Sequence, residues 1–148
     1  MILLDSCAIL NILLGETGAS TLSDFLDSEQ SKGNEVALLS LVLLEVSSAI
    51  AVRFKEERLA DGELPDYLDR LKPFQNYLIY DDLTPDIIAH SANIKAIHSA
   101  SMVDCCLISN AIRRNAEIAT CDPEILNYSK QNAKHRRITE QFKTIQWK

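Results

Sequence analysis

Hydrophobic residues in this chain gather in short uninterrupted runs, and longer segments with apolar positions at helical spacing lie between the runs. Runs of this kind are typical of strands that are covered on both faces. The predicted strands are residues 1–4, 35–40, 77–80, 117–121 and 143–148. The predicted helices are residues 6–15, 18–33, 41–59, 65–76 and 101–115, with a further helix that begins at Pro85. Strands that alternate with helices favour an α/β fold, in which a parallel sheet of about five strands is sandwiched between helices.

Local signals define several element boundaries. Ser20 or Thr21 is expected to cap the second helix, and Ser40 the third. Thr84 followed by Pro85 is a strong helix start, because proline is tolerated at the first helical position. No repeat or linker divides the chain, so a single domain over residues 1–148 is expected.

The formal net charge of −6 argues against a broadly basic nucleic-acid-binding protein. The charge is unevenly distributed, however. Residues 1–127 contain 9 Lys and Arg against 20 Asp and Glu, a net charge of −11, whereas residues 128–148 contain 6 against 1, a net charge of +5. The basic C-terminal segment is compatible with phosphate contacts, although on charge alone an ordinary solvated segment is the simpler interpretation.

The sequence predicts neither a secreted nor a membrane protein. Residues 1–4 offer no cationic segment before an apolar one, and Asp5 interrupts the run. The most hydrophobic window, residues 36–52, has 17 residues and contains three serines and a glutamate, too polar for a membrane span. We therefore expect a cytoplasmic protein that does not cross a membrane.

Four acidic residues fall near the carboxyl ends of predicted strands, where sites form in open parallel sheets. Asp5 directly follows the first strand and Asp122 the fourth. Glu45 is an isolated charge about one turn into the helix that follows the second strand. Asp104 lies near the start of the helix over 101–115. All four are predicted at the same edge of one sheet.

Each acid also has a structural explanation. Asp5 could cap the first helix. Asp104 stands three residues after Ser101, as in a capping box. Asp122 could start a turn. The structural explanation is weakest for Glu45, because a buried carboxylate without a partner or a metal is costly.

Converging carboxylates repel one another unless they are protonated or bridged by cations. A set of oxygen ligands with few His or Cys suits Mg²⁺ or Mn²⁺. One or two such ions can generate a hydroxide and stabilise an in-line phosphoryl displacement. The four acids therefore predict a metal-dependent site that acts on a phosphate ester.

The remaining chemistry-bearing residues form no competing site. The cysteines have neither CxxC nor zinc-ligand spacing and are expected to pack as small buried hydrophobes. A weaker hypothesis is that oxidation of the cysteines beside the acids disturbs metal binding. The absence of G-x-G-x-x-G, G-x-x-x-x-G-K-[ST] and G-x-S-x-G weakens nucleotide-binding and serine-hydrolase alternatives. The cysteines are Cys7, Cys105, Cys106 and Cys121.

Four stretches of the chain resemble the PIN domain family, and more narrowly its VapC-type toxin ribonucleases. They are MILLDSCAIL with Asp5, LLSLVLLEV with Glu45, SMVDCCLISNAI with Asp104 and EIATCDPEI with Asp122. The order Asp, Glu, Asp, Asp, with T-x-D after a short strand, is similar to the family pattern over nearly the whole chain. The resemblance implies a three-layer α/β/α sandwich with a parallel central sheet.

The resemblance also implies an activity, a Mg²⁺- or Mn²⁺-dependent endoribonuclease whose four acids hold metal and position the attacking water. Ser6 and Thr120 would support the acids through hydrogen bonds. Ser6 would then cap the first helix in place of Asp5. For toxin members the resemblance further implies a homodimer that a protein antitoxin neutralises.

Contacts to RNA phosphates need cations, which are scarce on the acidic part of the chain. For the arginine pair near residue 113 the alternative is that both complement the C-terminus of their helix. The candidates are Arg113, Arg114, Lys134, Arg136 and Arg137.

Two other function classes stay open. The first is a catalytically silent PIN-like module that binds RNA or a protein, against which the complete set of four acids argues. The second is a phosphatase or receiver-like doubly wound domain. A phosphatase of that kind has Asp-x-Asp after its first strand, whereas here Asp5 is followed by Ser6 and Cys7.

Overall fold

The computed structural model of the chain describes residues 1–57, 77–80, 83–128 and 143–145, together with Asp69, Leu71, Lys72 and Phe74. Its centre is a sheet of five parallel strands in the order β3-β2-β1-β4-β5. The predicted α/β fold with a parallel sheet is confirmed. The strands are β1 (Ile2–Leu4), β2 (Val36–Leu39), β3 (Leu78–Tyr80), β4 (Glu117–Ala119) and β5 (Lys143–Ile145).

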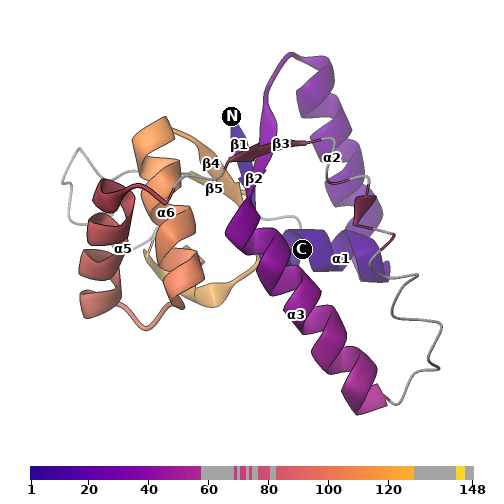
Figure 1. Cartoon of the computed structure of the whole chain (residues 1–148). Coiled ribbons are helices and arrows are strands. Elements are labelled where there is room, and N and C mark those ends of the chain that lie inside the picture. The colour runs from indigo at the N-terminus through magenta and orange to yellow at the C-terminus, as the bar shows by residue number, and fades with distance from the viewer. Residues whose placement is uncertain are drawn as a thin grey trace.

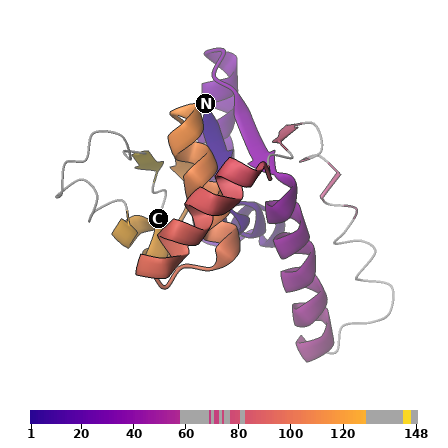
Figure 2. The same ribbon diagram turned by 60° about the vertical axis from the view of Figure 1, so that its left-hand side comes forward.

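Helices cover both faces of the sheet. In Figures 1 and 2, α5 and α6 lie on one face and α1 and α2 on the other, while α3 extends away from the sheet. None of the helices in the described part of the chain is long and apolar enough to span a membrane. The helices are α1 (Ser6–Leu14), α2 (Ala19–Ser31), α3 (Ser40–Glu57), α5 (Pro85–Ile97) and α6 (Met102–Arg114).

The central strand β1 is an uninterrupted apolar run because both of its faces are covered. Every residue of β1 and of β2 is buried. Ile2 of β1 lies opposite Val36 of β2 on one side and Glu117 of β4 on the other. The strand therefore links the two halves of the sheet at its middle.

The direction in which strands are added to the sheet reverses at β1. The chain adds β2 and β3 on one side of β1, and β4 and β5 on the other. The segments that leave β1 and β4 therefore diverge, and such a reversal leaves a crevice at the carboxyl ends of the two strands. Asp5 directly follows β1 and Thr120 directly follows β4 at this point.

The predicted cap of α2 is wrong. The helix begins at Ala19 with Gly18 as its N-cap, and neither Ser20 nor Thr21 caps it. Gly18 has a φ of 91°, a left-handed conformation that glycine adopts without strain. The helix therefore begins directly after the turn that Gly18 completes.

The other two predicted helix starts have different outcomes. Ser40 is the first residue of α3 rather than its cap, because β2 ends at Leu39 and continues into the helix without a loop. Thr84 caps α5 as predicted, since its side chain accepts a hydrogen bond from the Ile87 N–H at 3.4 Å and Pro85 begins the helix.

Some predicted elements lie outside the described residues. Most of the predicted helix over 65–76 and the end of the last predicted strand, residues 146–148, belong to this group. Leu71 and Phe74 are described, and both are buried.

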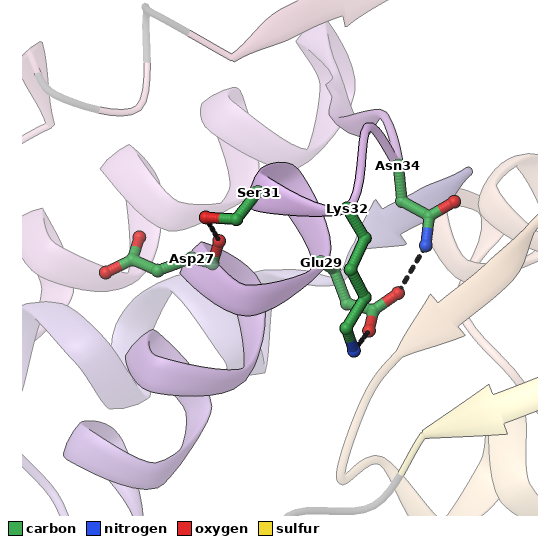
Figure 3. A network of polar contacts seen from close by, with 5 residues as sticks. All are labelled: Asp27, Glu29, Ser31, Lys32 and Asn34. Carbon is green, nitrogen blue, oxygen red and sulfur yellow. Dashed lines mark hydrogen bonds and ion pairs between the residues drawn. The ribbon is translucent and has the colours of Figure 1, made fainter.

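The connection from α2 to β2 is held by side chains at the end of the helix (Figure 3). The Glu29 carboxylate accepts hydrogen bonds from Lys32 Nζ at 2.7 Å and from Asn34 Nδ2 at 2.5 Å, which lowers the pKa of Glu29. The Ser31 hydroxyl donates to the Asp27 carbonyl at 2.8 Å. These contacts fix the turn from which β2, and after it α3, departs.

Replacing Leu3 by alanine tests the importance of the central strand. Leu3 is fully buried in the middle of β1, so Leu3→Ala is expected to lower the free energy of unfolding by about 2–5 kcal/mol. Urea denaturation followed by circular dichroism measures the change. Ile97→Ala is the control, because Ile97 is 75% exposed and its truncation should change the stability by less than about 0.5 kcal/mol. Equal losses in the two variants would contradict this account of the core.

Candidate metal centre

Three acidic residues meet at the carboxyl edge of the sheet. One ligand oxygen each from Asp5, Glu45 and Asp104 lies within 4.8 Å of the other two. Asp5 follows β1, Glu45 lies early in α3, and Asp104 lies in the first turn of α6. The structure thus brings together three of the four predicted acids from segments that are far apart in the sequence.

Asp5 has a structural role in addition to its place in this acidic cluster. Its side chain is 2% exposed and caps α1, where Oδ1 accepts a hydrogen bond from the Ser6 N–H at 2.6 Å. The predicted transfer of the cap to Ser6 is therefore wrong. A carboxylate has room for several acceptor contacts, so capping leaves oxygen lone pairs for a further ligand.

Thr120 and Ser6 both contact the acids. The fully buried Thr120 hydroxyl donates to Asp5 Oδ2 at 2.6 Å and accepts the Asp122 N–H at 2.9 Å. The Ser6 hydroxyl donates to Asp5 Oδ1 at 3.4 Å, and Ser6 also opposes the rise in the pKa of Glu45 that burial causes. These contacts are of the kind that orients a ligand carboxylate.

The sequence places Cys7 beside Asp5, but the hydrogen bonds that Cys7 forms there were not predicted. The Cys7 thiol donates to Asp5 Oδ2 at 3.1 Å, and Cys7 Sγ accepts the Cys121 N–H at 3.0 Å. The available signal was its position two residues after a strand-end acid, in the first turn of a helix. The packing role expected of all four cysteines fits Cys105 and Cys106, which are buried, whereas Cys7 and Cys121 are only partly buried and form a polar contact with each other.

Glu45 presents an unsatisfied oxygen. Within the described part of the chain, its buried Oε2 atom has no hydrogen-bond partner. A buried carboxylate oxygen without a partner is unfavourable, and a bound cation would remove that cost. Glu45 also lines a groove of about 350 Å³, together with Leu41, Leu44, Ser48, Ala49 and Val103.

Asp104 occupies the capping box that its spacing from Ser101 suggested. The Ser101 side chain accepts the Asp104 N–H at 3.1 Å, and Asp104 Oδ2 accepts the Ser101 N–H at 2.8 Å. The box determines where the carboxylate stands relative to α6. Lys95 holds the preceding turn, since its Nζ donates to the Ala100 carbonyl at 2.7 Å.

Asp122 lies outside the group of three. Its Oδ1 accepts the Glu124 N–H at 2.6 Å, and its carbonyl accepts the Leu126 N–H at 3.0 Å, which is the turn-forming role considered for it. Its charge nevertheless contributes to raising the pKa of each clustered acid. The structure therefore gives Asp122 an electrostatic connection to the cluster, and its role as a metal ligand stays a prediction.

Burial is the main cause that raises the pKa values of Asp5, Glu45 and Asp104, and the mutual repulsion of the acids adds to it. The hydrogen bonds from Thr120 and Ser6 oppose this shift without cancelling it. The cluster is thus an arrangement that favours protons or cations. Its donors are all oxygen atoms, which suits Mg²⁺ or Mn²⁺ better than a thiophilic metal.

The predicted RNA-binding arginines lie away from the cluster. Arg113 and Arg114 end α6, about 15 Å along the helix from Asp104 at the usual rise per residue. Arg113 Nη1 donates to Thr84 Oγ1 at 3.4 Å, and the Arg114 guanidinium carbon lies 3.8 Å from the centre of the Tyr80 ring. This position agrees with the alternative role at the helix C-terminus. Lys134, Arg136 and Arg137 lie outside the described residues.

Comparisons with known proteins agree on one fold. The model of the PIN domain matches residues 2–131. The chain is similar to PAE2754 from Pyrobaculum aerophilum, with 16% identity and a TM-score of 0.66 over 98% of this chain and 89% of that one. It is also similar to VapBC2 from Rickettsia felis bound to a DNA fragment from the promoter, with 18% identity and a TM-score of 0.65 over 100% of both chains.

A toxin-antitoxin complex from Klebsiella pneumoniae is a third similar structure, with 14% identity and a TM-score of 0.60 over 85% of this chain and 90% of that one. At these identities the likeness shows the fold alone. No curated protein matches the chain. The family match, in contrast, covers most of the chain and includes all three clustered acids. The chain belongs to the PIN domain family.

Proposed function

We propose that this protein is a metal-dependent endoribonuclease that cleaves RNA phosphodiester bonds. The observation that supports this most is the convergence of Asp5, Glu45 and Asp104, whose ligand oxygens lie within 4.8 Å of one another, with a buried Glu45 oxygen that has no hydrogen-bond partner in the described part of the chain. PIN domains are generally nucleases, so the family agrees with the chemistry of the site.

Asp5, Glu45 and Asp104 are the residues that would hold Mg²⁺ or Mn²⁺, with Asp122 as the fourth acid of the proposed set. When bound, such an ion activates a water molecule and stabilises negative charge on a phosphoryl group. The chain itself supplies the orientation of the ligands. Thr120 and Ser6 direct the Asp5 carboxylate through hydrogen bonds, and the capping box directs Asp104.

The charge distribution explains why the proposed activity needs a cation. Residues 1–127 carry 20 acidic against 9 basic residues, so the clustered acids add to a field that repels RNA. A divalent ion at the cluster would offset most of the charge of the three carboxylates and would provide a positive centre for the scissile phosphate. We propose residues 128–148, with 6 basic residues against 1 acidic residue, as a further contact to RNA phosphates. Lys134, Arg136 and Arg137 are among these basic residues.

We also propose that the protein is a cytoplasmic toxin, a single domain over residues 1–148 that forms a homodimer and is neutralised by a protein antitoxin. The similarity to a toxin-antitoxin complex and to VapBC2 supports this assignment.

Replacing Asp5 by asparagine tests the proposed reaction. Asp5→Asn keeps a side-chain oxygen for the α1 cap but removes the negative charge, so RNA cleavage with Mg²⁺ or Mn²⁺ should fall more than about 100-fold. Asp27→Asn is the matched control on the exposed face of α2 and should cleave like the wild type. Undiminished cleavage by Asp5→Asn would contradict the assignment as a metal-dependent endoribonuclease. A folded wild-type protein that neither binds Mn²⁺ nor cleaves RNA would instead favour a catalytically silent RNA- or protein-binding module.

Replacing Glu45 by glutamine tests the repulsion in the cluster. The pKa of Glu45 is raised in the folded protein, so the metal-free protein loses stability as the pH rises from about 4.5 through the folded pKa. Glu45→Gln removes this charge and should raise the melting temperature at pH 7 by about 1–2 °C, a small change because Glu45 is only partly buried and solvent screens its charge. At about pH 4 the wild type is protonated in both states, so the gain should vanish.

With Mn²⁺ the wild type is expected to have the higher melting temperature, because the ion should stabilise the wild type and not Glu45→Gln. Differential scanning calorimetry with and without Mn²⁺ measures both effects. Asp24→Asn, an exposed change of the same charge on α2, is the control and should leave both melting temperatures unchanged. A lower metal-free melting temperature in Glu45→Gln at pH 7 would contradict the repulsion.

Expression in a bacterial host tests the toxin assignment. Induction of the wild type should slow growth, whereas Asp5→Asn at the same protein level should not. Light scattering of purified Asp5→Asn should give twice the chain mass of 16.6 kDa if the homodimer forms. Normal growth with active, soluble wild-type enzyme would count against a toxin, and a mass of one chain would count against the dimer.

A further inference from the structure

The thiol of Cys7 lies at the point where β1, α1 and β4 meet. Its Sγ donates to Asp5 Oδ2 at 3.1 Å, accepts the Cys121 N–H at 3.0 Å and lies 3.6 Å from Thr120 Oγ1. One contact therefore reaches the proposed ligand, and the others reach the segment after β4. The side chain is half-buried, so these contacts are only partly exposed to competition from water.

The Asp5 carboxylate has two oxygens in different surroundings. Oδ1 is fixed by the Ser6 N–H at 2.6 Å. Oδ2 receives side-chain donors, the Thr120 hydroxyl at 2.6 Å and the Cys7 thiol at 3.1 Å. A thiol is a weaker hydrogen-bond donor than a hydroxyl. It can therefore orient the Asp5 carboxylate while leaving lone-pair density on Oδ2 for a bound cation.

Without Cys7, the only remaining side-chain donor to Oδ2 among these contacts would be Thr120, whose hydroxyl also accepts the Asp122 N–H at 2.9 Å. The Cys121 N–H would lose its partner as well. The carboxylate and the segment after β4 would then move more independently of each other. Metal affinity depends on such outer contacts, whose loss typically weakens binding about 10–100-fold.

We propose that Cys7 is a positioning residue for the metal centre, which acts by orienting the Asp5 carboxylate and tying it to the segment after β4. This inference rests on the proposed metal-dependent function. Cys7 is not one of the side chains that could jointly bind an ion. Those side chains are Asp5, Glu45 and Asp104.

The test compares the Mn²⁺ dissociation constants of full-length variants by calorimetry. Cys7→Ala removes the donor and should weaken Mn²⁺ binding at least about 10-fold. Cys7→Ser keeps a group that both donates and accepts and should stay within about 3-fold of the wild type. Cys106→Ala is the matched control, because Cys106 is a buried thiol on α6 outside the cluster. It should lose thermal stability while its Mn²⁺ affinity is unchanged.

Cleavage assays give an independent readout. If Cys7 acts through metal binding, the activity lost in Cys7→Ala at low Mn²⁺ should return toward the wild-type value at saturating Mn²⁺. A purely structural role predicts no such recovery. Cys7→Val fills a similar volume without a donor and is measured alongside alanine, in case the alanine variant folds poorly. It should bind Mn²⁺ as weakly as Cys7→Ala.

A folded Cys7→Ala or Cys7→Val with the Mn²⁺ affinity of the wild type would overturn the inference. A Cys7→Ser variant that binds Mn²⁺ as weakly as Cys7→Ala would also overturn the inference. These outcomes differ from a failure of the proposed function. If the wild type binds no Mn²⁺, the metal-dependent function is wrong, whereas if the wild type binds Mn²⁺ and all Cys7 variants do so equally, only the role of Cys7 is wrong.

Discussion

Asp5, Glu45 and Asp104 bring carboxylate oxygens within 4.8 Å of one another in partly buried surroundings, and burial raises the pKa of each. In the absence of a cation this arrangement is unfavourable, because like charges repel and desolvation disfavours their ionised forms. The surrounding fold must therefore hold the three groups in place. It does so with a fully buried central strand and with hydrogen bonds to the Asp5 and Asp104 carboxylates.

Helix starts explain how the fold tolerates this cluster. In a parallel sheet covered by helices, the helices that follow the strands begin at the carboxyl edge, where their N–H groups and positive dipole ends face the site. Asp5 caps α1 and Asp104 completes the capping box of α6, so the first turns of two helices stabilise the negative charge. Structural capping and membership of the cluster are thus properties of the same carboxylates. The structural interpretation is therefore confirmed for Asp5 and Asp104, and it is compatible with their proposed role as metal ligands.

The two ends of α6 carry side chains of opposite charge. Its first turn carries Asp104 at the acidic cluster, and its last turn carries Arg113 and Arg114, where cations complement the helix C-terminus. Arg114 stacks on Tyr80, whose hydroxyl in turn donates to Glu35. The arginines therefore have partners of their own far from the acids.

Much of this protein could be predicted from its sequence. The apolar runs of β1 and β2 indicate strands covered on both faces, since such continuous runs are stable only when buried. The strand-end position of Asp5 and the isolation of Glu45 in an apolar helix follow from spacing alone. Local chemistry likewise predicted the start of α5 at Thr84 and Pro85, because a cap involves contacts within one turn.

Other features depend on contacts between distant segments and were decided by the tertiary structure. Strand order brings the segment after β4 beside β1, and this placed Thr120 on Asp5 Oδ2 and the Cys121 N–H on Cys7 Sγ while leaving Asp122 outside the group of three. Gly18, rather than Ser20 or Thr21, begins α2 because the conformation of the preceding turn outweighs cap preference. The sequence by itself determined which residues stand at the ends of the elements. The distances between their side chains were decided by the tertiary structure, because they depend on how the sheet and its helices pack.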